Sequence, residues 1–169
     1  MMTHANQKIE TTDTELIVTR TFDAPRKLVF AAYSSCEHIQ NWYGSRSCLI
    51  VECTMDFRVG GFWHYCLRDP LTGDESWSKA VYQEIVEPEL IAYSSAVADA
   101  EGNIDETMPR MHSRVELSDV DGKTQLTLRA TFSSPSDLQQ VLGMGVIPKF
   151  TEALKRLEEH LAALAATDA

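Results

Sequence analysis

The end of the chain carries one apolar stripe at helical spacing. Large apolar side chains recur at intervals of three and four residues, at Ile147, Phe150, Leu154, Leu157, Leu161 and Leu164. This spacing predicts a long amphipathic helix. Gly143, Gly145 and Pro148 predict a break or kink near its start. A helix with one apolar side has to bury that side against a partner surface, which the rest of the chain must supply.

Seven segments upstream of this helix are typical of β-strands. They are rich in β-branched and aromatic residues, and they cover residues 15–23, 47–56, 62–69, 76–87, 89–98, 111–119 and 123–132. Turn sequences such as DPLTGD and DVDG separate some of them, which favours an antiparallel meander. Two short helices are expected after the first strand, over APRKLVFAAYSS and CEHIQNWYG. We therefore predict an α+β fold in which a curved antiparallel sheet of about six or seven strands wraps around the long C-terminal helix.

The length and the termini predict one domain. A chain of 169 residues suits a single domain, which we place at residues 15–164. Residues 1–14 are polar and lack the basic and apolar regions of a secretory signal, so we expect a disordered or frayed N-terminus. Residues 165–169 are expected to form a short tail. No apolar run is long enough to span a bilayer, so the expected location is the cytoplasm.

Charge and cysteine content narrow the classes of partner. Fifteen basic and twenty-five acidic residues give a net charge of −10. A surface this acidic repels the phosphates of nucleic acids and of anionic membranes, so neither is expected as a partner. Cys36, Cys48, Cys53 and Cys66 form no CxxC pair, which favours reduced, partly buried thiols over a zinc site. No metal or cofactor is expected.

Two adjacent glycines mark a sharp bend in the sheet. In DFRVGGFWHYCL, residues 56–67, Gly60 and Gly61 separate charged residues from a run of aromatic rings. Glycine reaches positive φ at little cost and permits close turns, so the pair is expected to bend the chain where two strands meet. Asp56 and Arg58 are expected to form an ion pair or a turn cap that fixes this hairpin.

The strand after the glycines delivers large rings to one face of the sheet. Alternation places Trp63, Tyr65 and Leu67 on the concave, helix-facing side and His64 on the other. Such rings either fill the space as plain core or line a partly open apolar cavity whose tyrosine hydroxyls orient a ligand. Both alternatives stay open. The expected cavity residues are Trp63, Tyr65, Leu67, Tyr82, Tyr93, Met111, Ser113, Val115, Phe150 and Leu154.

The sequence predicts no catalytic residue. It contains no GxSxG, HExxH, P-loop or GxGxxG pattern. His64 and His112 fall by alternation on the face away from the rings. A convergent acid, base and orienting group, which catalysis requires, is therefore not expected.

Several motifs, taken in order, resemble those of a known family. RTFDAPRKLVFAAYSSCEHIQNWYG combines an Ala-Pro pair, a Val-Phe helix and a tryptophan turn, DFRVGGFW carries an Asp-x-Arg-x-Gly-Gly signature, and AVYQEIVEPELIAYS carries Tyr-x-Glu-Ile-x-x-Pro. GKTQLTLRATF and LKRLEEHLA fit its last strand and final helix. Over residues 15–164 the chain resembles the activators of the ninety-kilodalton heat-shock chaperone's ATPase, within the START-like, birch-pollen-allergen-like (SRPBCC) superfamily. It is similar to the stand-alone bacterial members, because it is too short to hold the extra N-terminal domain of the eukaryotic ones.

The resemblance implies a helix-grip fold and leaves three functions open. The first is binding of a small hydrophobic or amphipathic ligand between sheet and helix. The second is contact with a chaperone as a co-regulator of its ATPase, and the third is a cyclase- or hydrolase-like activity in the same cavity. The chain departs from the family pattern at Cys36, where proline is common, at Lys149-Phe150, where Gly-Trp is common, and at Pro148. The changes at 148–150 alter the lip of the cavity, so the ligand is not carried over from the family. The oligomeric state stays open.

Overall fold

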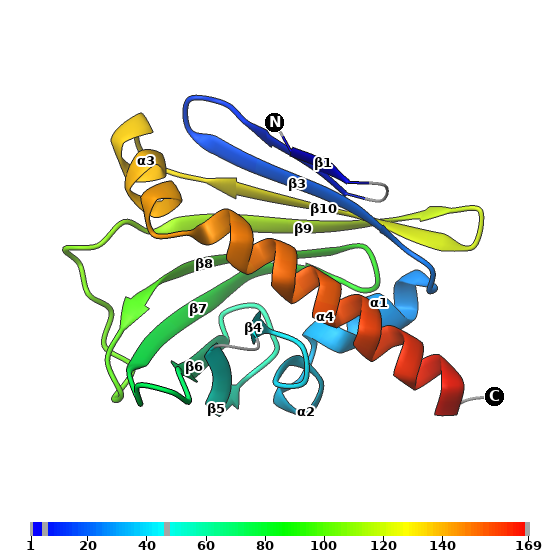
Figure 1. Ribbon diagram of the computed structural model, residues 1–169, viewed down its shortest axis with the longest axis horizontal. Coiled ribbons are helices and arrows are strands. Elements are labelled where there is room, and N and C mark those ends of the chain that lie inside the picture. The colour runs from blue at the N-terminus through cyan, green and yellow to red at the C-terminus, as the bar shows by residue number, and fades with distance from the viewer. Residues whose placement is uncertain (1, 5–6, 46–47, 168–169) are drawn as a thin grey trace.

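The computed structural model describes residues 2–4, 7–45 and 48–167, and within them ten strands form one antiparallel sheet (Figure 1). The strands follow the spatial order β1-β2-β3-β10-β9-β8-β7-β6-β5-β4. Their bounds are β1 (Met2–His4), β2 (Gln7–Thr11), β3 (Glu15–Phe22), β4 (Gly44–Ser45), β5 (Cys48–Met55), β6 (Phe62–Arg68), β7 (Glu75–Val86), β8 (Leu90–Ala98), β9 (Met111–Val120) and β10 (Lys123–Thr131). The helices are α1 (Arg26–Tyr33), α2 (Cys36–Ile39), α3 (Pro135–Gly143) and α4 (Val146–Thr167).

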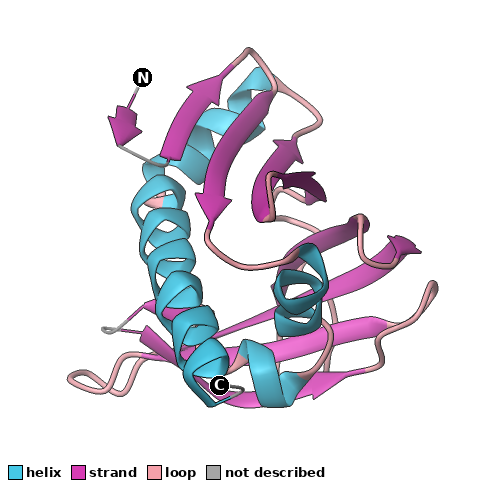
Figure 2. Cartoon of the chain, turned by 90° about the vertical axis from the view of Figure 1, so that its right-hand side faces the viewer, coloured by secondary structure: helices cyan, strands magenta, loops and turns pink. Residues whose placement is uncertain are grey.

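The predicted α+β arrangement is confirmed, because α4 crosses the strands obliquely on one face of a curved antiparallel sheet (Figure 1, Figure 2). All seven expected strands are present, as β3 and β5–β10. The expected number of six or seven is nevertheless too low. The N-terminal strands β1 and β2 extend one edge of the sheet, and the two-residue strand β4 extends the other.

The N-terminal segment is more ordered than its polar composition suggested. The frayed terminus predicted for residues 1–14 is corrected for residues 7–11, which pair as β2 with β3. Ile9 is buried by packing, and Gln7 is buried because its amide bonds to Arg20 and Thr151. Residues 1, 5 and 6 lie outside the described part of the chain. At the other end, 165–167 continue α4 rather than forming the expected tail, and 168–169 are outside the described residues.

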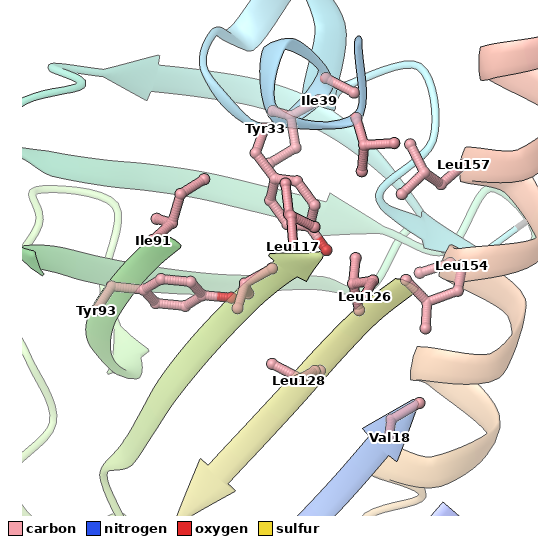
Figure 3. Close-up of a cluster of buried hydrophobic side chains, with 14 of the residues drawn as sticks. Val18, Tyr33, Ile39, Ile91, Tyr93, Leu117, Leu126, Leu128, Leu154 and Leu157 are labelled. Carbon is pink, nitrogen blue, oxygen red and sulfur yellow. The ribbon is translucent and has the colours of Figure 1, made fainter. Parts of the chain in front are cut away.

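The apolar stripe of α4 is buried against the sheet, as its spacing predicts. Leu154, Leu157 and Leu161 are each at most 3% exposed. They meet side chains from α1, α2 and the concave face of the sheet, which Figure 3 shows around Leu154 and Leu157. The predicted break also appears: α3 ends at Gly143, and Gly145 has a φ of 83° just before α4 begins.

The two adjacent glycines solve two different steric problems. Gly60 has a φ of 85°, which L side chains rarely adopt. At Gly61 a Cβ atom would lie 2.0 Å from the Asp56 carbonyl oxygen, so the turn closes only without a side chain. The same turn bonds to the next strand, because Gly60 N–H donates to Tyr82 O at 2.9 Å and Tyr82 N–H to Gly61 O at 3.0 Å. Arg58 Nε donates to Asp56 Oδ2 at 2.7 Å across it.

The cysteines differ from the expectation of four reduced thiols. Cys36 and Cys53 form a disulfide with a Cα–Cα distance of 5.9 Å, and Cys48 and Cys66 are free. Seventeen positions separate the bonded pair. The sequence spacing alone does not indicate the pairing, because it depends on how α2 packs beside β5.

A cavity between the sheet and the start of the final helix

A cavity of about 230 Å³ lies between the first turns of α4 and the sheet. Strands β6 to β9 form its sheet side, and the segment from the end of α2 into β5 forms a third wall. Sixteen of the described residues line the cavity, namely Tyr43, Gly44, Ser45, Cys48, Tyr65, Leu67, Ser76, Trp77, Ser78, Val97, Met111, Met144, Val146, Lys149, Phe150 and Ala153. This described part of the wall is mainly apolar, with a small number of hydroxyl groups and one charged side chain.

Of the ten residues that the sequence predicted to line a cavity, four lie in the wall of this cavity. Tyr65 and Leu67 reach it from β6, Met111 from β9 and Phe150 from α4. The other six are corrected, since they belong to the packed interior: Trp63, Tyr82, Tyr93, Ser113, Val115 and Leu154. They share the concave face, but they lie further along their elements, where α1, α2 and the middle of α4 close over the sheet. Figure 3 shows Tyr93 and Leu154 within that interior cluster.

Tyr43 and Ser78 complete a group of hydroxyls with Tyr65. Hydrogen bonding with Tyr43 and Ser78 acts to lower the pKa of Tyr65, but burial outweighs it and raises that pKa overall. Desolvation, followed by the proximity of Tyr65, raises the pKa of Tyr43 well above its usual value. Both phenols therefore stay protonated at neutral pH, and each can donate a hydrogen bond or accept one.

The tyrosine rings are held in place by their neighbours. Tyr43 meets the rings of Trp63 and Tyr65 edge to face, with centroids 4.8 and 5.5 Å away, and Trp63 stacks on Tyr65 at 4.2 Å. Such contacts stabilise aromatic groups beyond simple burial. Trp63 thus lies behind the lining and supports the two rings that form it.

The polar residues missed by sequence reasoning had weak signals. Tyr43 belongs to the Trp42-Tyr43-Gly44 turn, which was expected to end a helix at Gly44, whereas α2 ends at Ile39. Ser78 lies on a strand, where a small polar residue gives no indication of facing inward. Cys48 also lines the cavity, and burial raises its pKa, so its thiol is protonated at neutral pH.

None of the four histidines whose side chains the structure describes lines the cavity. His64 is on the face opposite the rings, where Nε2 is 2.9 Å from Asp99 O and the imidazole stacks on Trp77. His112 is exposed on β9. His38 and His160 contact each other between α2 and α4, with Nδ1 and Nε2 3.3 Å apart. Among the described residues, no group of three histidine, cysteine, aspartate or glutamate side chains could hold a metal ion.

A long helix gripped by a curved antiparallel sheet, with a cavity near the helix start, defines a helix-grip domain. The chain belongs to the family described as "Activator of Hsp90 ATPase homolog 1-like protein", which matches residues 23–162. A search of curated proteins finds no match. None of the helices described is long and apolar enough to cross a membrane.

Solved bacterial structures share this fold over nearly their whole length. A protein from Staphylococcus epidermidis is 33% identical, with a TM-score of 0.79 over 92% of this chain and 94% of that one. A protein from Arthrobacter aurescens is 22% identical, with a TM-score of 0.86 over 92% and 91%. Protein Ms6760 from Mycobacterium smegmatis is 24% identical, with a TM-score of 0.82 over 92% and 94%.

Proposed function

We propose that this protein binds a small amphipathic molecule in the cavity between the sheet and α4. The observation that carries the proposal is the lining itself, in which an apolar wall surrounds the hydroxyls of Tyr43, Tyr65 and Ser78. Ligand sites have this composition, since apolar groups supply affinity and a small number of polar groups fix orientation. The volume of about 230 Å³ favours a compact ligand, because cavities for drug-sized molecules begin at about 300 Å³.

Apolar burial alone would give weak binding. Covering about 300 Å² of ligand surface contributes about 7 kcal/mol at about 25 cal/mol per Å². Association costs at least about 4 kcal/mol, which leaves about 3 kcal/mol, or a millimolar-range dissociation constant. The polar groups of the wall therefore decide both affinity and selectivity.

The direct test is to identify what the protein retains and then to fill the cavity. Mass spectrometry of natively purified protein is expected to find a small molecule that organic extraction removes. Val97→Phe puts a ring into the cavity and should abolish retention, whereas Val120→Phe, at an exposed position, should leave it unchanged. Equal retention by both variants, or no binding of any amphipathic probe, would contradict the proposal.

The family description supports a second proposal, contact with a chaperone of the ninety-kilodalton class. A net charge of −10 would favour a basic patch on such a partner. The test is the ATPase rate of the purified chaperone with and without this protein. No change in that rate, together with no complex in a pull-down, would remove this second function.

A further inference from the structure

Among the described residues that line the cavity, Lys149 is the only one with a charged side chain. None of these described lining residues is a carboxylate, although the chain has twenty-five acidic residues and only fifteen basic ones. Because acidic residues outnumber basic ones in this chain, a random set of its residues would contain acidic groups more often than basic ones. The local charge at this site is therefore opposite to that of the whole molecule.

Lys149 lies in the first turn of α4, where its side chain is exposed at the edge of the cavity. Lys149 and Cys48 line the same cavity. Burial raises the pKa of the half-buried Cys48 thiol, and the positive charge of Lys149 acts in the opposite direction. Within the described residues, its amine forms no ion pair. The partial positive charge at the start of a helix adds to that of the amine.

Asp69 is an acidic group that acts on this edge of the cavity, and its carboxylate is hydrogen-bonded within a turn. Asp69 acts on the same thiol in the opposite direction to Lys149. Its carboxylate accepts the N–H of Leu71 at 2.8 Å, and its own N–H donates to Asp74 O at 2.9 Å. Asp69 thus fixes the turn between β6 and β7, and within the described residues it forms no ion pair with Lys149.

We propose that the ligand is a small amphipathic carboxylate, with its tail in the cavity and its head group bound by Lys149 at the mouth. The inference rests on the proposed function, and it adds the chemical class of the ligand. A single cation matches a single negative charge, whereas a net charge of −10 repels a more highly charged ligand such as a phosphate ester. An ammonium head group would meet Lys149 as a like charge.

Three probes with one tail and different head groups test the proposal. Octanoate, octanol and octylamine are titrated into the protein at neutral pH and low salt, where their heads are negative, neutral and positive. Octanoate is expected to bind about three- to tenfold more tightly than octanol, and octylamine more weakly than both. Added salt should reduce the advantage of octanoate, because Lys149 is exposed.

Three variants at two lysines of α4 separate the effect of the local charge from that of the net charge. Lys149→Met should reduce octanoate affinity about three- to tenfold while changing octanol affinity by less than about twofold. Lys149→Arg should retain the preference for octanoate. Lys155→Met changes the net charge equally on the outer side of α4 and should leave all three affinities unchanged.

These outcomes distinguish a failure of the carboxylate inference from a failure of the proposed function. If octanol and octanoate bind equally well to the wild type, or if Lys149→Met and Lys155→Met behave alike, the carboxylate inference is wrong and the proposed function stands. If no probe binds the wild-type protein, both are overturned.

Discussion

At the scale of single residues, the hydroxyl of Tyr65 has the most contacts to lose in the cavity. It interacts with the hydroxyls of Tyr43 and Ser78, and its ring stacks on Trp63. Tyr93 offers a matched comparison. It lies in the packed interior, where burial raises its pKa above the usual range and Ser113 acts in the opposite direction. The two phenols are thus alike in burial, but only one lines the cavity.

Tyr65→Phe is expected to weaken ligand binding more than Tyr93→Phe does. Each change removes one buried hydrogen-bonding group and should lower the free energy of unfolding by about 0.5–1.5 kcal/mol. Only Tyr65→Phe also removes a polar group from the cavity wall. Chemical denaturation and probe titration measure the two effects separately. An equal loss of affinity in both variants would mean that the cavity hydroxyls do not orient the ligand.

At the scale of elements, α2 is fixed by side-chain contacts to two of its neighbours. The Cys36–Cys53 disulfide joins it to β5, and the contact between His38 and His160 joins it to α4. The segment that follows α2 supplies Tyr43, Gly44 and Ser45 to the cavity. The position of this short helix therefore sets one wall of the proposed binding site.

Loss of the disulfide is expected to lower stability without unfolding the protein. For a loop of about 17 residues, chain entropy predicts about 3 kcal/mol of stabilisation. Cys53→Ser should therefore shift the denaturation midpoint down, while Cys48→Ser, at a free and only partly buried thiol, should shift it much less. Alkylation of the denatured protein without reductant should label Cys48 and Cys66 only. Four alkylated thiols under these conditions would contradict the disulfide and support the original expectation.

The contact between His38 and His160 should make stability depend on pH. Burial, and then the proximity of His38, lowers the pKa of His160 below its ordinary value of 6.5. The folded state therefore takes up this proton less readily than the unfolded state does. Stability is complete above pH 6.5 and declines as the pH falls toward the lowered pKa. His160→Gln should make the thermal midpoint vary less with pH over this range. If the pH dependence of the midpoint is the same in the variant, other groups cause it.

At the scale of the whole molecule, strand β2 and the final helix α4 are joined through a buried polar network. Arg20 Nη1 donates to Gln7 Oε1 at 2.6 Å, and Gln7 Nε2 donates to Thr151 Oγ1 at 3.1 Å. Arg20 also approaches Glu158 at 3.4 Å. These bonds connect β2, β3 and α4, so the contacts between the helix and the sheet extend to the strand next to the edge strand β1.

Arg20→Met is expected to destabilise strand β2 more than the rest of the fold. Removing the guanidinium leaves buried Gln7 without one of its partners, which costs about 1–3 kcal/mol. Hydrogen exchange should become faster in residues 7–11 than elsewhere. The control is Arg129→Met, which removes a partly exposed pair with Glu15 and should cost less than about 1 kcal/mol. Uniform exchange across the chain would show that the network does not hold β2.

Periodicity predicted most of the fold, because seven strands and a long helix each carry a clear apolar pattern. It missed β2, since Gln7 is buried by hydrogen bonds rather than by its hydrophobicity. Alternation correctly identified the concave face of the sheet. It gave no information on depth along a strand, so Tyr82 and Val115 were grouped with Tyr65 although they lie in the closed core. The role of Lys149 depends on the tertiary placement of the α4 start.

Helix α4 anchors the fold with one part of its length and lines the cavity with another. Leu154, Leu157 and Leu161 are fully packed, whereas Lys149 and Phe150 contribute to the opening one or two turns earlier. A mutagenesis library confined to position 144 and positions 146–150, which keeps Gly145 and its φ of 83°, would thus vary the entrance while leaving the anchoring leucines untouched. This scaffold should accept redesigned selectivity at that end of the helix with little penalty in expression or solubility.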